Sequence, residues 1–106
     1  MRVLEFVAEG QKLSRDPSCD FTGIAAGSRG YLQARFRFDR EWNGCKKVAV
    51  FLRRGVEYPV GLKNNACIIP WEALEDSRAV QVYVEGRMGD IKITTNMTAF
   101  PQSVRR

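Results

Sequence analysis

The stretch YLQARFRF, residues 31–38, decides the fold class, because its side chains alternate in character along its whole length. Successive side chains of a β-strand point to opposite faces, so a period of two predicts a strand that is buried on one side. The face expected to point into the core is formed by Leu32, Ala34, Phe36 and Phe38. The face expected to point outward is formed by Tyr31, Gln33, Arg35 and Arg37.

Similar short patterns continue on both sides of this stretch. Further strands are expected over residues 3–7, 47–53, 57–62, 66–69, 79–85, 90–95 and 97–100. Between them lie residues that favour chain reversal, namely Asn43-Gly44, Arg54-Gly55, Asn64-Asn65 and residues 86–89. We therefore expect an all-β protein, an antiparallel β-sandwich of seven or eight short strands that is immunoglobulin-like or jelly-roll-like. A small barrel is the alternative.

The chain of 106 residues has room for one domain. We expect a single β-sandwich domain over residues 1–101 and a short basic tail over 102–106. Proline at the start of residues 70–75 favours one short helical connector there, and the patternless loop over residues 14–30 is expected to be pinned to the body by Phe21 and Ile24. The expected core residues are Phe36, Phe38, Trp42, Phe51, Trp71, Leu74, Val82 and Ile93.

The residues that catalysis and metal binding usually require are scarce. The chain has no histidine, and its three cysteines contain no C-x-x-C pair. Cys67 lies among apolar residues, and only Cys45, which precedes two lysines, has a setting that lowers a thiol pKa. We therefore expect no enzyme, no catalytic residues, no cofactor and no metal. No apolar run approaches the roughly 20 residues of a membrane helix, so no membrane contact is expected.

The basic side chains are the remaining candidates for function. The net charge is +5, and the 17 basic residues are spread along the chain. Arginine beside tyrosine is typical of protein interfaces, although the same pair can bind single-stranded nucleic acid or simply face solvent. The candidate interface residues are Tyr31, Gln33, Arg35, Arg37, Arg53 and Arg54.

Several motifs, taken together, resemble a family of small β-sandwich proteins from tailed phages and prophages of gut Firmicutes. They are residues 27–38, Glu41-Trp42-Asn43-Gly44, residues 47–51, residues 69–74, residues 82–86 and residues 93–96. The resemblance spans about residues 27 to 100. It implies a domain similar to the N-terminal attachment domains of baseplate and tail proteins.

This resemblance implies a phage structural or assembly protein that decorates a virion or joins baseplate or tail parts. Its partners are then other protein subunits, either further copies of itself or phage structural proteins, and its location is the host cytoplasm during assembly and later the virion. One alternative is a small phage-encoded inhibitor that binds a host defence protein. The other is a β domain that binds single-stranded nucleic acid, a less favoured partner because no known nucleic-acid-binding motif is present.

Overall fold

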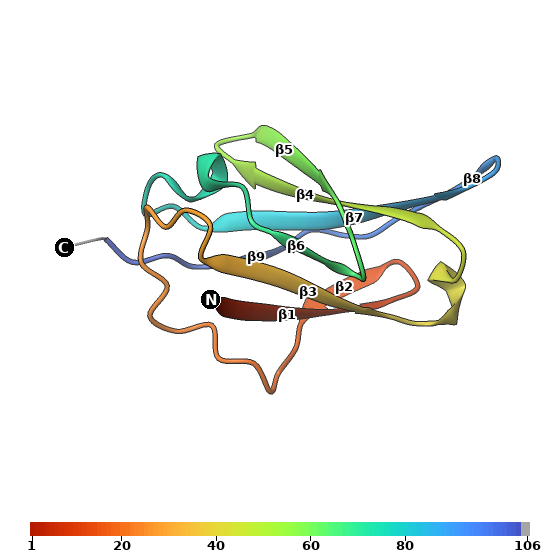
Figure 1. Cartoon of the computed structure of the whole chain (residues 1–106), viewed down its shortest axis with the longest axis horizontal. Helices are drawn as coiled ribbons and strands as arrows, with labels where there is room; N and C mark the ends of the chain where they lie inside the picture. The colour runs from red at the N-terminus through yellow and green to blue at the C-terminus, as the bar shows by residue number, and fades with distance from the viewer. Residues whose placement is uncertain (105–106) are drawn as a thin grey trace.

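The computed structural model describes residues 1–104, which form two β-sheets packed face to face (Figure 1). The first sheet contains, in order, β2 (Lys12–Arg15), β1 (Arg2–Glu9), β3 (Leu32–Phe38) and β6 (Ala66–Ile68). The second contains, in order, β5 (Val56–Gly61), β4 (Lys46–Arg53), β7 (Val80–Met88) and β8 (Ile91–Thr94), and β9 (Thr98–Phe100) also pairs with β7. The expected all-β sandwich is confirmed. No helix among the described residues has the length and apolar character needed to cross a membrane.

The first sheet differs from the expected arrangement in two ways. The described residues form nine strands, because residues 12–15 pair with β1 as an additional strand. In this short segment only Leu13 is apolar, so its sequence carries almost no alternating pattern. In addition, β1 and β3 run parallel, whereas every other strand pair is antiparallel within the described chain. Parallel neighbours require a long connection, and β2 together with the loop after it provides one.

The core lies between the two sheets and is rich in aromatic rings. Phe6 stacks on Phe36 with ring centroids 5.2 Å apart, and the loop residue Phe21 meets Phe6 edge-on at 5.5 Å. Of the core residues expected from the sequence, the fully buried ones are Phe36, Trp42, Phe51, Leu74 and Val82. Two others are half-buried and pack against this core, namely Phe38 and Ile93.

Trp42 forms the corner between the two sheets. It ends the 3₁₀ turn η1 (Arg40–Trp42), and its indole N–H donates a hydrogen bond to the Gly10 carbonyl at 2.9 Å. The ring lies directly against Gly86, where an added Cβ would come within 2.8 Å of it. Glycine at position 86 therefore makes room for the indole in the middle of β7.

Trp71 does not belong to the core, contrary to expectation. It begins the second 3₁₀ turn, η2 (Trp71–Leu74), which is the expected helical connector. Ala73 and Leu74 fill the space at this end of the core, so the indole stays 37% exposed. Its ring is covered instead by the Arg29 guanidinium, 4.1 Å from the ring centroid.

The β7–β8 hairpin projects beyond the end of the first sheet (Figure 1). Ile91, which alternation placed on the inward face, is therefore largely exposed. With no opposite sheet to cover this tip, alternation along β8 does not separate buried from exposed residues.

The loop after β2 and the C-terminal segment are held together. Phe21 and Ile24 are buried, as expected for residues that pin the loop. Ser103 forms a parallel bridge with Ala25, and Gln102 is buried. The packed body thus reaches Ser103, two residues beyond the boundary expected at residue 101. The last two tail residues, 105 and 106, lie outside the described residues.

Candidate interaction surfaces

The outward side chains of β3 lie on one exposed face of the first sheet. The inward positions of β3 are Leu32, Ala34 and Phe36, which are all buried. Tyr31, Arg35 and Arg37 are exposed on the opposite side, and Gln33 is half-buried there. The alternation of residues 31–38 therefore brings four of the six candidate interface residues together.

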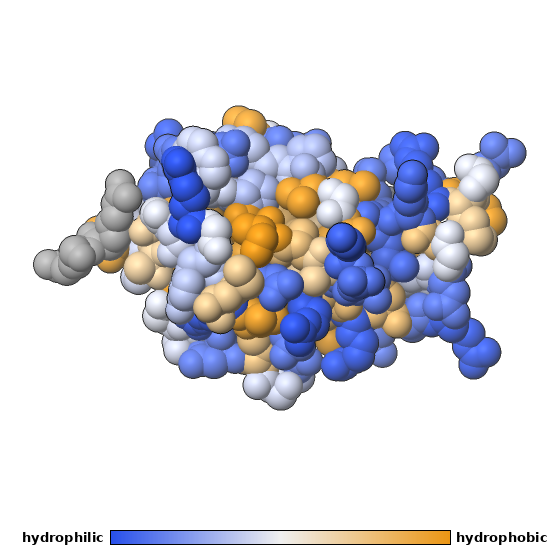
Figure 2. Space-filling view, viewed as in Figure 1, coloured by the Kyte–Doolittle hydropathy of each residue, from blue (hydrophilic) through white to orange (hydrophobic). Residues whose placement is uncertain are grey.

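Strand register identifies the neighbours of these four residues. On the β6 side Gln33 lies opposite Ile68, and on the β1 side Arg35 lies opposite Glu5. Ile68 is 41% exposed, an unusual setting for so apolar a side chain. We call this surface the β3 face; it comprises Val3, Glu5, Val7, Tyr31, Gln33, Arg35, Arg37, Ala66 and Ile68. In the view of Figure 2, apolar surface lies over β6 and hydrophilic surface flanks it.

The charges at the β3 face alternate in sign. Arg37 forms an ion pair of 3.4 Å with Asp16, which lies at the end of β2. The hydroxyl and backbone N–H of Ser18 donate to Asp16 at 2.7 and 2.9 Å, and together with Arg37 they lower the pKa of this carboxyl. With Glu5 opposite Arg35 in the strand register, two arginines and two carboxylates lie at this surface. A hollow of about 350 Å³ lies among them, bordered by Asn64 and Asn65.

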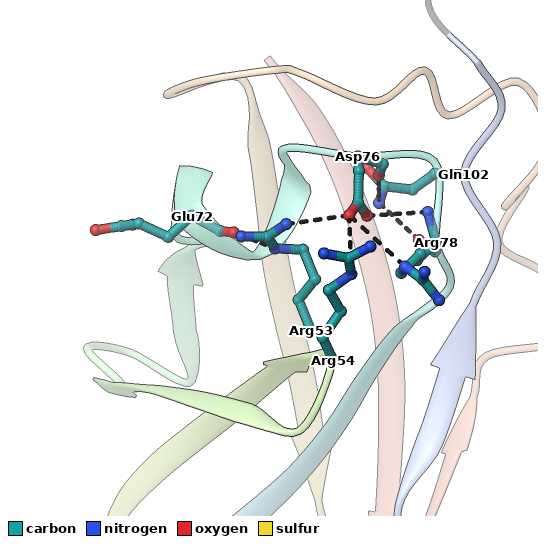
Figure 3. Close-up of polar contacts among 6 residues, drawn as sticks. All are labelled: Arg53, Arg54, Glu72, Asp76, Arg78 and Gln102. Carbon is teal, nitrogen blue, oxygen red and sulfur yellow. Dashed lines mark hydrogen bonds and ion pairs between the residues drawn. The ribbon is translucent and has the colours of Figure 1, made fainter.

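Arg53 and Arg54 do not join the β3 face. They lie at the end of β4 and in the β4–β5 turn of the second sheet, where both guanidiniums contact Asp76 (Figure 3). Arg78 approaches the same carboxylate oxygen, so three arginines surround one carboxylate. The distances from Asp76 Oδ2 are 3.1 Å to Arg53, 3.6 Å to Arg54 and 3.8 Å to Arg78. We call these four residues the arginine cluster.

Several further contacts hold the arginine cluster in place. Arg53 Nε donates to the Glu72 carbonyl at 2.8 Å, and the Arg78 N–H donates to Asp76 Oδ1 at 3.2 Å. Gln102 Nε2 donates to the carbonyls of Asp76 and Arg78, both at 2.8 Å. Although partial burial alone would raise the pKa of Asp76, the backbone N–H of Arg78 and the guanidiniums of Arg53 and Arg54 lower this pKa overall.

Asp76, Arg78 and Gln102 were not recognised as site residues from the sequence. The one local signal is the spacing of Asp76 and Arg78, because an aspartate often accepts a hydrogen bond from the backbone two residues later. Arg53 and Gln102 each lie more than twenty positions from Asp76 in the sequence, so their contacts with it have no local signature.

Side chains of types that can take part in catalysis have structural contacts in this protein. Asp39 caps η1 by accepting from the Glu41 N–H, and its second oxygen accepts from the Gly10 N–H at 2.8 Å. Burial raises the pKa of the Cys67 thiol to about 12, so this group stays protonated near neutral pH. All three cysteines are free thiols, and no group of three or more potential metal ligands occurs within residues 1–104.

A hollow of about 680 Å³ lies beside the loop after β2. It is lined by side chains from residues 15–24 and from residues 101–103. Phe21 and Ile24 contribute its apolar wall, and the Arg15 guanidinium lies 5.0 Å from the centroid of the Phe21 ring. The loop after β2 thus borders an open groove.

Comparison with known proteins yields no assignment, since neither a protein-family model nor a curated protein sequence matches this chain.

Proposed function

We propose that the chain is a non-catalytic structural or assembly subunit of a phage particle, and that it contacts further copies of itself through the β3 face. The observation that carries the contact is the exposed Ile68 beside the outward side chains of Tyr31 and the β3 arginines. Tyrosine and arginine next to an apolar centre are the residues that contribute most to protein interfaces. The phage origin rests on the resemblance of residues 27–100 to small phage β-sandwich proteins.

The charge pattern favours a second copy as the occupant. A two-fold interface places the same patch of both subunits against each other, so each patch must complement itself. The β3 face meets this requirement because arginines on β3 lie beside Glu5 on β1 and Asp16 at the end of β2. A strand of nucleic acid would instead favour a groove of positive charge alone.

A binding role also agrees with how the reactive side chains are used. Asp39 and Asp76 accept hydrogen bonds from backbone N–H groups that hold turns together. Cys67 is kept in its thiol form by burial, whereas a nucleophilic cysteine requires a lowered pKa.

The proposal is tested by measuring molar mass with light scattering during size-exclusion chromatography, over protein concentrations up to about 1 mM, which detects even weak self-association. We expect a concentration-dependent dimer. Ile68→Asp introduces a charge into the contact and Arg35→Glu reverses one. Each is expected to raise the dissociation constant of the dimer by about tenfold or more.

Two matched controls carry the same substitutions outside the β3 face. Ile91→Asp changes an exposed isoleucine of β8, and Arg40→Glu changes an exposed arginine of η1. Both are expected to assemble like the unmodified protein. A wild-type chain that stays monomeric throughout contradicts self-assembly, and equal loss of assembly in Ile68→Asp and Ile91→Asp contradicts the β3 face as the contact.

A further inference from the structure

The arginine cluster has more positive charge than its own contacts neutralise. Three guanidiniums share the single carboxylate of Asp76, which leaves an excess of two positive charges among the four residues. Two acidic side chains nearby, Glu72 and Glu57, are directed elsewhere. The Glu72 carboxylate points away from the cluster (Figure 3), and Glu57 accepts a hydrogen bond from the Tyr83 hydroxyl at 3.1 Å.

Two of the three arginines remain open to solvent. The side chains of Arg54 and Arg78 are each 58% exposed, and their ion pairs with Asp76, at 3.6 and 3.8 Å, are too long for good hydrogen bonds. A guanidinium has five N–H donors, so both groups have donors left for an incoming acceptor. Arg53, by contrast, is only 20% exposed and is bonded to Asp76 and to the Glu72 carbonyl. It anchors the cluster while the other two face outward.

The backbone of Arg54 provides a separate indication that its side chain is used. Its φ is +54°, in the left-handed region that arginine rarely adopts, and the following Gly55 has φ +77°. Two-residue hairpin turns of this type favour asparagine at the first position. The same chain uses Asn64 and Asn65, with φ +54° and +60°, in the turn before β6. An arginine at position 54 therefore lowers stability relative to asparagine, and its weak ion pair gives little in return.

We propose that the arginine cluster binds the carboxylates of an acidic segment of a partner protein. The contacts with Asp76 show that the three guanidiniums converge on a carboxylate. The two exposed arginines, Arg54 and Arg78, have N–H donors left for a carboxylate of the partner. Arginine suits the task because its planar donors match a carboxylate in pairs. The hydrogen bonds from Gln102 to the carbonyls of Asp76 and Arg78 keep residues 76–78 in position before the partner arrives.

The binding site is tested with fluorescein-labelled hexaglutamate, whose binding is followed by fluorescence anisotropy at low salt, with labelled hexaglutamine as the neutral probe. The wild-type chain is expected to bind hexaglutamate and not hexaglutamine. Arg78→Gln is expected to raise the dissociation constant about two- to fivefold, as typical for one exposed ion pair, and the double variant Arg54→Asn/Arg78→Gln about tenfold. Arg40→Gln, an exposed arginine elsewhere, serves as the matched control and is expected to bind normally.

Two variants distinguish a binding site from a purely structural cluster. Arg54→Asn is expected to raise Tm by about 2–5 °C, because asparagine suits the turn, while it weakens hexaglutamate binding. Asp76→Asn removes the internal competitor and keeps an acceptor for the Arg78 N–H, so it is expected to bind hexaglutamate more tightly. Weaker binding by a folded Asp76→Asn variant, or unchanged binding by Arg54→Asn, overturns the proposal.

The partner class is tested with a labelled twelve-residue oligothymidylate. Binding that is tighter than that of hexaglutamate, and that is lost in the Arg54→Asn/Arg78→Gln variant, overturns an acidic protein segment in favour of nucleic-acid phosphates. This site goes beyond the β3 face, and the two proposals fail separately. Ile68→Asp is expected to bind hexaglutamate normally, and Arg78→Gln is expected to self-associate normally.

Discussion

Alanine substitutions of Trp42 and Trp71 are expected to differ strongly, although both residues occupy similar corner motifs in the sequence. Trp42 is fully buried, packs against Phe38 with ring centroids 5.0 Å apart, and donates to the Gly10 carbonyl. Trp71 is 37% exposed and is covered mainly by Arg29. The comparison therefore tests the packing of the two corners with the same chemical change.

The expected losses follow from these contacts. Removing a buried tryptophan usually costs about 3–5 kcal/mol, and the Gly10 carbonyl left without its donor adds about 1 kcal/mol. We therefore expect Trp42→Ala to lower the free energy of unfolding by about 4–6 kcal/mol. For Trp71→Ala we expect about 1–2 kcal/mol, since it loses one exposed cation–π contact and part of its buried area. Because small domains are stable by about 5–15 kcal/mol, only Trp42→Ala approaches complete unfolding.

Urea denaturation followed by far-ultraviolet circular dichroism measures both losses, because this signal comes mainly from the backbone and so remains usable when a tryptophan is replaced. Arg29→Ala serves as a control, and we expect it to lose about 0.5–1 kcal/mol, the usual size of an exposed cation–π contact. If Trp42→Ala and Trp71→Ala lower the free energy of unfolding by amounts within about 1 kcal/mol of each other, the different packing derived for the two corners is wrong.

Three further predictions concern individual contacts. Gly86→Ala is expected to lower the free energy of unfolding by about 1–3 kcal/mol, because its Cβ would lie 2.8 Å from the Trp42 ring. The same change is expected to cost much less in a Trp42→Ala background, and a double-mutant cycle by urea denaturation measures this coupling. Asn96→Ala is expected to lower the free energy of unfolding by about 1–3 kcal/mol, because the Asn96 side-chain amide forms hydrogen bonds with both the backbone N–H and the carbonyl of Leu13. Asn43→Ala, at an exposed position after η1, is the control and is expected to cost less in the same assay. Burial raises the pKa of Cys67 from 9.0 to about 12, so the unfolded chain releases this proton at lower pH than the folded chain. The free energy of unfolding should therefore fall as pH rises from 9 toward 12. Urea denaturation curves at several pH values should show a smaller fall for Cys67→Ala. Additive losses in the Gly86 and Trp42 cycle would contradict their contact, and an Asn96→Ala variant as stable as the wild type would contradict the bonds to Leu13. An equal fall of stability with pH in the wild type and in Cys67→Ala would contradict the raised pKa of Cys67.

Strand alternation predicted the parts of the fold that depend on local pattern. The burial of Phe36 and the exposure of Arg35 and Arg37 followed from residues 31–38 alone, since the second sheet covers one side of β3 and solvent covers the other. β2 escaped detection because one apolar residue, Leu13, makes no pattern. The exposure of Trp71 was equally hidden, because it depends on Ala73 and Leu74 having already filled the end of the core.

The candidate surfaces were predictable only where one strand supplies them. Four of the six interface residues lie on or beside β3, so their common face was visible in the sequence. Arg53 and Arg54 are adjacent in the sequence, yet their partner Asp76 lies more than twenty residues away. The Asn96 amide likewise joins the segment after β8 to Leu13 of β2, far away in the sequence. Such long-range polar contacts follow from the packing of the two sheets and have no local pattern.

The two proposed surfaces differ in chemistry, and this difference makes their contributions separable in a single experiment. The β3 face includes the exposed Ile68 on the edge strand β6, and burial of apolar surface is strengthened by salts such as sulfate. The arginine cluster attracts its partner by charge, which salt screens over about 10 Å at 0.1 M. A dimer formed through the β3 face presents two arginine clusters, so an acidic partner with two suitable segments gains affinity from both. Raising the sulfate concentration should therefore keep the dimer while it releases the acidic partner. Loss of the dimer together with the acidic partner would mean that charge, and not the burial of Ile68, holds the β3 face together.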